Sequence, residues 1–402
     1  MKITAVETIR PAERPNVIWV VLHTDEGVSG LGESWFGAGA IEADVHERIA
    51  PLLMGEDAAG IERLTRTITP YTGFFGTGAE MRAVSAVDVA LWDLAGKRAG
   101  LAITELLGGP FRSSIKVYNT CAGPDYVSQT SDVRPGNFGL GGGGELKGRR
   151  FEDLDGFLNR PEEVAAELIE MGITSMKIWP FDFAEGAADG ADISTADLKT
   201  ALEPFERIRK AHGDKMAIKA ELHGLWSVPA AKKIVAALEE IVPDWIEDPI
   251  WMDRIEDLAE VAACTDAPIA GGETLGGLGQ IRSLVAGGGV SVPIIDVTWG
   301  GGITFARKSA GLAEAHGLPI AFHDCSGPVT LAASTHLALS APNVAEQEIT
   351  RAFYYGWYHE YVDEPAPLEH GKIGVSGRPG LGLELAEGLR QRPGIAVRRS
   401  ES

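Results

Sequence analysis

Polar residues recur at regular intervals in the second half of the chain, each after a short apolar run. Glu221, Glu247 and Glu273 are separated by 26 residues each. Three further polar residues follow at intervals of 23, 27 and 25: Asp296, His323 and Glu348. Such an interval accommodates one strand, one helix and two connections. The spacing therefore predicts one polar residue at the end of each strand of a repeated strand–helix unit.

The three evenly spaced glutamates have the composition of a metal site. Carboxylates at adjacent strand ends repel one another unless a cation lies among them. Oxygen ligands suit a hard cation, Mg²⁺ or Mn²⁺. We therefore predict that Glu221, Glu247 and Glu273 bind Mg²⁺. The alternative for any one of them is a solvated surface charge.

Other polar residues at predicted strand ends could move a proton. Lys177 is a candidate base, because a neighbouring divalent cation lowers the pKa of an ammonium group; the alternative is a surface lysine whose stem covers apolar surface. Asp296 and His323 end adjacent predicted strands and are expected to form a hydrogen bond that fixes the imidazole tautomer. The alternative is a purely structural pair. His223 ends the same strand as Glu221.

The elements that must position these residues alternate along the chain from residue 115. The predicted strands are Ile115–Thr120, Ser175–Trp179, Met216–Leu222, Trp245–Asp248, Ile269–Glu273, Ile294–Thr298, Ile320–Asp324 and Ala345–Ile349. The predicted helices are Pro161–Met171, Thr195–His212, Pro229–Ile241, Ile255–Cys264, Leu278–Ala286, Phe305–His316 and Val329–Ala341. This alternation predicts a closed parallel barrel, with an open doubly wound sheet as the alternative.

The flanking segments do not alternate. Residues 1–114 contain two clear strand patterns and the helix pattern Ala83–Ala99, which together indicate an α+β domain. We expect the barrel to occupy residues 115–361. The tail, residues 362–402, is expected to form one short helix near Leu383–Leu389 and to pack on the N-terminal domain.

A long glycine-rich segment, Gly123–Arg150, follows the first predicted barrel strand. Its run Gly139–Gly144 formally contains G-x-G-x-x-G. A dinucleotide site needs that motif in a tight turn between a strand and a helix, whereas these glycines lie deep inside a long connection. A mobile loop after the first barrel strand is the preferred interpretation, and a lid over the active site is one role that such a loop can have.

Composition excludes several classes of partner. The chain has 402 residues with a formal net charge of −21, and its basic residues are scattered. Nucleic acid and anionic membranes are therefore not expected as partners. The three cysteines do not suggest a disulfide framework, and the first residues lack the apolar core of a signal peptide. We expect a cytoplasmic protein.

The ordered set of motifs resembles the mandelate racemase/muconate lactonizing enzyme branch of the enolase superfamily, over nearly the whole chain. The matching segments are Ser85–Asp93, Leu106–Gly109, Glu247–Pro249, Gly272–Glu273, Asp296 with Trp299–Thr304, and Pro379–Gly382. The resemblance implies a (β/α)7β barrel with an α+β capping domain built from the N-terminal segment and the C-terminal tail. It also implies a homo-oligomer, from dimer to octamer.

The resemblance further implies a reaction on a small carboxylate substrate. Mg²⁺ on the three glutamates would stabilise the enediolate formed when the proton next to the carboxylate is removed. Lys177 and His323, the latter paired with Asp296, would act on opposite faces of the substrate. Glu348 would support the substrate carboxylate.

Three positions depart from the family pattern. Ser175 replaces the first lysine of the usual Lys-x-Lys, so Lys177 lacks a neighbour that lowers its pKa. Glu221 stands where aspartate is usual. His223 stands where asparagine is frequent, and a histidine there can act as the acid that expels a hydroxyl group.

We therefore expect dehydration of a sugar acid, an aldonate or aldarate, to a 2-keto-3-deoxy acid. Racemisation, epimerisation or lactone cycloisomerisation is one alternative, and a non-catalytic barrel that binds a sugar acid or a metal is another. Specificity is expected to come from the loop Tyr71–Thr77 and from four aromatic residues: Trp35, Phe36, Trp179 and Trp226. The alternative for each aromatic residue is packing in the core.

Overall fold

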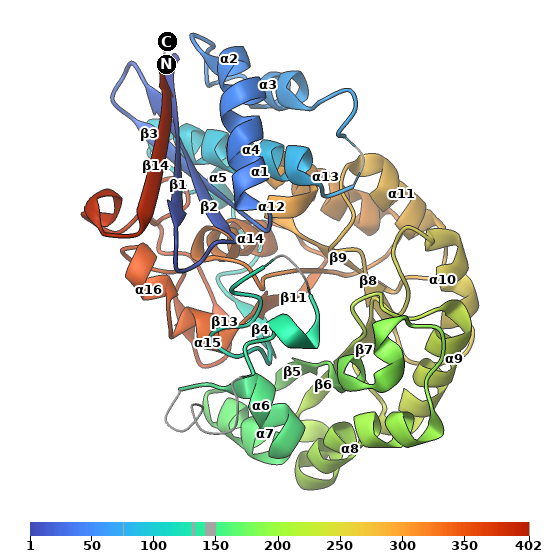
Figure 1. The fold of residues 1–402 in the computed structure, drawn as a ribbon. Helices are drawn as coiled ribbons and strands as arrows, with labels where there is room; N and C mark the ends of the chain where they lie inside the picture. Colours follow the sequence, from blue (N-terminus) through green and yellow to red (C-terminus); the bar gives the residue numbers. More distant parts are fainter. Residues whose placement is uncertain (75, 131–132, 141–149, 402) are drawn as a thin grey trace.

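The protein consists of a barrel and a cap that covers one end of it (Figure 1). The computed structural model describes residues 1–74, 76–130, 133–140 and 150–401. In this part of the chain, one sheet of four antiparallel strands belongs to the cap, and the other sheet contains the barrel. The predicted fold class, a barrel of alternating strands and helices with an α+β cap, is confirmed.

The cap sheet has the strand order β14-β1-β2-β3. Its strands are β1 (Ile3–Pro11), β2 (Val17–Thr24), β3 (Ser29–Trp35) and β14 (Ile395–Glu401). The helices of the cap are α1 (Ala38–Asp44), a π-helix (Val45–Ile49), α2 (Ala50–Leu53), α3 (Ile61–Ile68), α4 (Ala79–Ala99) and α5 (Ile103–Leu106).

Helix α4 packs closely on strand β3. A Cβ atom on Gly30 or Gly32 of β3 would lie 2.1 or 1.8 Å from a carbonyl oxygen of α4, so only glycine permits this approach. Gly100 ends α4 in the left-handed conformation, with φ of 67°.

The tail differs from its prediction. The helix expected near Leu383–Leu389 is wrong: the structure has only a 3₁₀ turn at Leu389–Gln391, followed by strand β14. Most of β14 is exposed, so its sequence lacks the alternation of a half-buried strand. The strand exists because β1 supplies backbone partners, with Ala5 opposite Glu401.

The barrel consists of parallel strands β4–β11. They are β4 (Ile115–Thr120), β5 (Ser175–Ile178), β6 (Ala217–Glu221), β7 (Trp245–Glu247), β8 (Ile269–Gly271), β9 (Val292–Ile295), β10 (Ile320–Phe322) and β11 (Val344–Ile349). Strand β11 pairs in parallel with β4, so the sheet closes and the open-sheet alternative is wrong. A hairpin of β12 (Leu368–Glu369) and β13 (Lys372–Ile373) adds antiparallel pairing at the start of β4.

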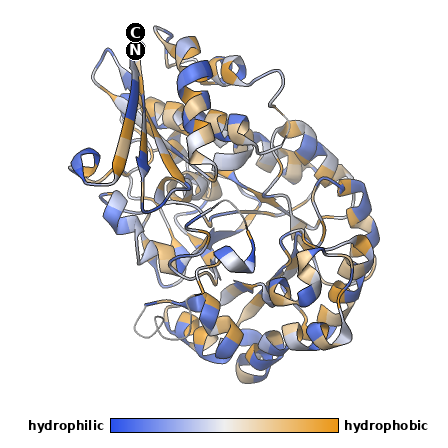
Figure 2. Cartoon of the chain, viewed as in Figure 1, coloured by the Kyte–Doolittle hydropathy of each residue, from blue (hydrophilic) through white to orange (hydrophobic). Residues whose placement is uncertain are grey.

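The helices around the barrel follow the predicted alternation. They are α6 (Asp153–Asn159), α7 (Pro161–Glu170), α8 (Thr195–His212), α9 (Val228–Ala237), α10 (Ile255–Ala262), α11 (Leu278–Ala286), α12 (Val297–Gly300), α13 (Gly302–Ala315), α14 (Pro328–Ser340), α15 (Arg351–Tyr354) and α16 (Tyr358–Tyr361). Hydrophilic and hydrophobic residues alternate along the outer helices (Figure 2), as expected for helices that pack one face on the strands.

The connection after β4 is described only in part. It contains a 3₁₀ turn at Pro135–Asn137 and then α6. Most of the glycine run Gly139–Gly144, on which the dinucleotide interpretation depended, lies outside the described residues. In the described part of the chain, no helix combines the length and apolar character needed to cross a lipid bilayer.

Candidate active site

The carboxyl ends of the barrel strands surround a cavity that faces the cap. Its described lining residues are Phe36, Thr120, Tyr126, Val127, Val133, Lys177, Trp179, Glu221, His223, Glu273, Trp299, His323, Cys325 and Glu348. Strand ends converge at this end in a parallel barrel, which explains why residues far apart in the sequence meet there. Most of the predicted site residues belong to this group.

The three evenly spaced glutamates come together. Glu221, Glu247 and Glu273 each offer an oxygen within 4.8 Å of the others. The backbone N–H groups of Leu222 and His223 donate to Glu221 Oε1 at 3.0 and 2.7 Å, which orients that carboxylate. Three converging carboxylates are the donor set that a hard divalent cation requires.

The electrostatics of this cluster also favour a cation. Burial, together with the charges of neighbouring carboxylates, raises the pKa of Glu247 to about 7. Burial likewise raises the pKa of Glu273 and of Asp248. These shifts express the cost of gathering negative charges away from water. A bound cation would offset that cost, so the residues present fit Mg²⁺ or Mn²⁺.

Lys177 lies at the centre of the acidic cluster. Its Nζ atom is 2.6 Å from Glu247, 3.1 Å from Glu221 and 3.2 Å from Glu348. Burial alone lowers the pKa of this ammonium group, but the surrounding carboxylates raise it well above its usual value. The alternative of an exposed surface lysine is wrong, because the Lys177 side chain is only 3 % exposed.

His323 and Asp296 form the predicted pair. His323 Nδ1 lies 2.7 Å from Asp296 Oδ2, and His323 Nε2 lies 3.4 Å from Glu273. Burial lowers the pKa of His323, yet Glu273, Glu348 and the bond to Asp296 raise it to about 10. The ring of Trp299 packs against the imidazole with centroids 4.7 Å apart, so the ring of His323 is held on two sides.

Glu348 is held as a carboxylate. Thr120 Oγ1 donates to Glu348 Oε1, and the backbone N–H of Asp324 donates to Oε2 at 2.9 Å. Burial raises the pKa of Glu348, but Lys177 and His323 lower it to about 2. The group is therefore a fixed negative charge at the cavity wall.

His223 lies on the opposite side of the barrel from His323, because β6 and β10 are four strands apart in an eight-strand ring. Its Nδ1 atom is 2.8 Å from Asp182 Oδ2, and its Nε2 atom is 3.4 Å from the Tyr126 hydroxyl. Burial lowers the pKa of His223, whereas the charges of Asp182 and Glu221 raise it to about 9.

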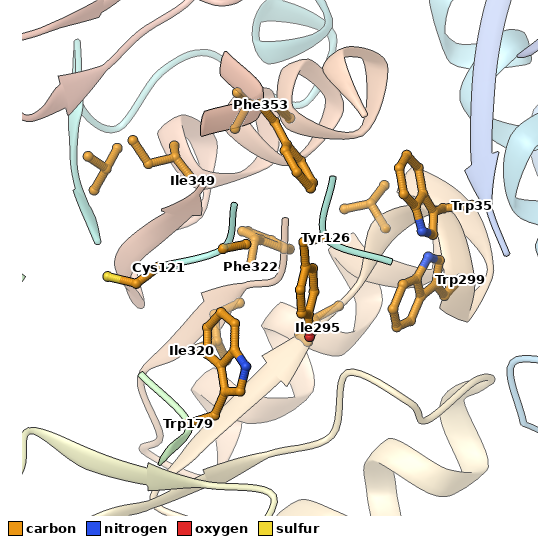
Figure 3. Packing of buried hydrophobic residues seen from close by; sticks show 14 of the residues in the cluster. Trp35, Cys121, Tyr126, Trp179, Ile295, Trp299, Ile320, Phe322, Ile349 and Phe353 are labelled. Atoms are coloured by element: carbon orange, nitrogen blue, oxygen red, sulfur yellow. The ribbon is translucent and has the colours of Figure 1, made fainter. Parts of the chain in front are cut away.

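The predicted aromatic residues divide into two groups. Phe36 and Trp179 line the cavity, whereas Trp35 and Trp226 do not. Trp35 stacks on Phe353 in the core (Figure 3), and the buried Trp226 lies beside Gly190. Contact of Trp35 or Trp226 with the cavity was therefore a wrong expectation. The described part of the loop Tyr71–Thr77 lies over a separate surface pocket, which Phe74 lines.

Several residues of the site were missed by the sequence analysis, among them Tyr126 and Asp182. Tyr126 belongs to the connection after β4, and its ring packs on Trp179 at 5.3 Å (Figure 3). Asp182 lies in the 3₁₀ turn Pro180–Phe183 that follows β5. The hydrophobic context of Asp182, between Phe181 and Phe183, is the one signal that could have identified it as a buried acid.

Comparisons with known proteins agree with this geometry. Residues 161–389 match the family described as enolase C-terminal domain-like, and residues 3–108 match the mandelate racemase/muconate lactonizing enzyme N-terminal domain. D-galactonate dehydratase of Ralstonia nicotianae is 34 % identical over 398 residues, which cover 97 % of this chain and 93 % of that relative. The D-galactonate dehydratase of Ralstonia pickettii is 32 % identical over 396 residues, with coverage of 97 % and 93 %.

Solved structures give the same result. An enolase of the mandelate racemase subgroup from Agrobacterium tumefaciens is 43 % identical, with a TM-score of 0.88 and coverage of 100 % of this chain and 99 % of that one. An enolase protein from the Sargasso Sea environmental sequences is 39 % identical, with the same TM-score and coverage. The barrel and its cap thus have their counterparts in one group of enzymes, and this chain belongs to the mandelate racemase/muconate lactonizing enzyme family of the enolase superfamily.

Proposed function

We propose that this enzyme dehydrates an aldonate, a sugar acid with one carboxylate, to a 2-keto-3-deoxy acid. The observation that carries the proposal is the placement of two histidines on opposite sides of the three-glutamate cluster, each held by a carboxylate at 2.7 or 2.8 Å. Dehydration needs a base for the proton next to the carboxylate and an acid for the leaving hydroxyl. The names of the D-galactonate dehydratase relatives support the same reaction class.

The metal ligands in this proposal are Glu221, Glu247 and Glu273. When bound there, Mg²⁺ would supply positive charge beside the substrate carboxylate and make the neighbouring C–H bond more acidic. Mn²⁺ has similar ligand preferences and is the second candidate.

The protein residues have separate roles. His323 removes the proton in its neutral form, while Asp296 fixes its tautomer through Nδ1. A cation bound by Glu273 would offset the carboxylate charge that raises the pKa of His323, and would thereby favour this neutral form. His223 donates a proton to the leaving hydroxyl. Lys177, held in its charged form by the glutamates, serves as a cation for the substrate carboxylate, and Glu348 fixes Lys177 and orients the bound acid.

The lining of the cavity favours a substrate with one carboxylate over an aldarate. Apart from Lys177 and the two histidines that act in the reaction, the described wall includes Phe36, Val127 and Trp299, which offer no positive charge to a second carboxylate. Arg82 lies 4.2 Å behind the Trp299 ring, and its Nε donates to the Thr77 carbonyl at 2.6 Å. The indole N–H groups of Trp179 and Trp299 have no hydrogen-bond partner among the described residues and are available to substrate hydroxyl groups.

Isomerisation is the second candidate, because Lys177 and His323 both line the cavity and could act on opposite faces of one carbon atom. Exchange with deuterated water, followed by NMR, separates the two reactions, since epimerisation incorporates deuterium without loss of water.

The direct test is a screen of aldonic and aldaric acids with the Mg²⁺-loaded enzyme, beginning with D-galactonate. We expect a keto acid from at least one aldonate and none from the aldarates. Formation of no keto acid from any aldonate would reject the proposal. We also propose a homo-oligomer, from dimer to octamer, which mass photometry would measure directly.

A further inference from the structure

Asp182 is the carboxylate that holds His223, and its own effect on the reaction follows from where its side chain lies. It belongs to the 3₁₀ turn Pro180–Phe183, directly after β5, and it is 2 % exposed. Its Oδ2 atom lies 2.8 Å from His223 Nδ1. Removing a carboxylate from water is unfavourable, so a buried aspartate needs a hydrogen-bonding or charged partner to offset the lost hydration. The imidazole of His223 is that partner.

The backbone of His223 is constrained as well as its ring. Its φ angle is 47°, in the left-handed region that residues with a Cβ atom rarely adopt, and its N–H donates to Glu221 Oε1 at 2.7 Å. Strain of this kind persists only where surrounding contacts enforce it, and it concentrates at functional sites. The imidazole of His223 is therefore fixed from the main chain and from Nδ1 together.

The remaining ring nitrogen of His223 has a polar neighbour at the cavity. Its Nε2 atom lies 3.4 Å from the hydroxyl of Tyr126, and both residues line the cavity. The ring of Trp179 packs on both side chains, with centroid distances of 5.3 Å to Tyr126 (Figure 3) and 5.7 Å to His223. Because Nδ1 is occupied by Asp182, Nε2 is the atom that can reach a substrate.

We infer that Asp182 is a positioning residue for His223: its carboxylate accepts a hydrogen bond from Nδ1–H and thereby directs Nε2–H, beside the Tyr126 hydroxyl, at the leaving group of the substrate. This inference rests on the proposed dehydration. His223 Nε2 gives its proton to the β-oxygen, and the C–O bond breaks with its electron pair remaining on oxygen, so that water leaves. The electron pair of the C–H bond cleaved by His323 becomes the new C=C bond, and the enol takes a proton from solvent on becoming the keto acid.

The arrangement predicts that the two halves of the reaction can be separated. In the variant Asp182→Asn, removal of the substrate proton by His323 should continue, because Asp296 and His323 lie on the other side of the barrel. Loss of water should fall by at least about 100-fold, the lower end of what a positioned acid contributes. Exchange of the substrate proton with deuterated water, measured by NMR, reports the first half, and keto-acid formation reports the second.

The matched control is Asp192→Asn. Asp192 lies in the same connection between β5 and α8 but is exposed and pairs with Lys233. We expect both rates to stay at the wild-type level. If Asp182→Asn lowers exchange and dehydration equally, or leaves dehydration unchanged, the positioning role is rejected.

A second measurement does not depend on turnover. In the Mg²⁺-loaded wild-type enzyme labelled with ¹⁵N-histidine, we expect His223 Nδ1 to carry a proton, with the assignment made from the spectrum of His223→Asn. A His223 Nδ1 without a proton would overturn the inference even if Asp182→Asn failed to fold. Absence of keto acid with every aldonate would instead reject the proposed function, while the ring spectrum would still decide the role of Asp182.

Discussion

Lys177 and Lys219 are register partners on the parallel strands β5 and β6, yet their ammonium groups pair with different carboxylates. Lys177 Nζ lies within 3.2 Å of three glutamates at the cavity. Lys219 Nζ lies 2.7 Å from both Asp244 and Glu346 and also donates to Ser175. The position where the family usually has its first lysine is thus occupied by a serine that binds a lysine from the next strand.

Replacement of Lys219 should reduce stability. In Lys219→Met, the buried carboxylate of Glu346 keeps Lys116, at 3.0 Å, as its remaining charged partner among the described residues. Loss of one member of a buried ion pair costs about 3–5 kcal/mol, so we expect the free energy of unfolding to fall by about 3 kcal/mol, the lower end of that range. Urea unfolding measures the change. The control is Lys233→Met, which breaks an exposed pair and should have little effect. An equal effect of the two substitutions would contradict the assigned role of Lys219.

Removal of a metal ligand should abolish turnover through loss of the cation. We expect Glu247→Gln to weaken Mg²⁺ binding by at least about 10-fold, the loss that follows removal of even a hydrogen-bond partner of a metal ligand. Isothermal titration with Mg²⁺ alone measures it. Glu260→Gln, which alters an exposed glutamate, is the control and should bind as the wild type does. Unchanged Mg²⁺ affinity in Glu247→Gln would remove this glutamate from the metal site.

Asp296 should affect turnover more than substrate binding, because it contacts His323 and does not line the cavity. In Asp296→Asn we expect kcat to fall about 100-fold with KM little changed. Asp296 Oδ1 also accepts from the N–H groups of Thr298 and Trp299 at the start of α12, so unfolding curves must accompany the kinetics. A rise in KM with unchanged kcat would assign Asp296 to binding instead.

The folded protein should lose stability in mild acid, because His336 is buried in its neutral form. Burial lowers the pKa of His336 from 6.5 to about 4, so between these values the unfolded chain binds a proton that the folded protein does not. The contribution of neutral His336 to the free energy of unfolding is therefore complete above pH 6.5 and is lost as the pH falls toward 4. Between pH 7 and 5 the loss is about 2 kcal/mol.

Urea unfolding of the wild type and His336→Asn at both pH values isolates this contribution, since the variant should lose correspondingly less stability on acidification. His316→Asn, at the exposed end of α13, should behave as the wild type does. The wild type and His336→Asn differ in their free energy of unfolding. If that difference were the same at both pH values, His336 would have the same pKa in the folded and unfolded protein.

The barrel was predictable because its strands are short apolar runs that recur at similar intervals along the chain. Each of the predicted barrel strands from Ile115 to Ile349 overlaps a strand of the structure, and helices α8 and α11 begin and end at the predicted residues. Parallel strands place their ends at one edge, so the convergence of Glu221, Glu247 and Glu273 follows from the fold alone.

The remaining parts of the site depend on contacts that the sequence does not reveal. The connection between β5 and α8 contains several acidic residues, and only the packing shows that Asp182 is buried while Asp192 is exposed. The sequence likewise does not tell which tryptophan reaches the cavity: Trp179 lines it, whereas the buried Trp226 does not. The domain limits at residues 114 and 361 stay predictions.

The pairing of β1 with β14 has a consequence for biosynthesis. Ala5 leaves the ribosome early, but its partner Glu401 is made only after the entire barrel. During translation, β1 is therefore an open sheet edge, and such edges recruit other chains. A premature stop or a proteolytic cut before Ile395 would leave that edge permanently open, so a truncated product that keeps every residue of the cavity should still be prone to aggregation.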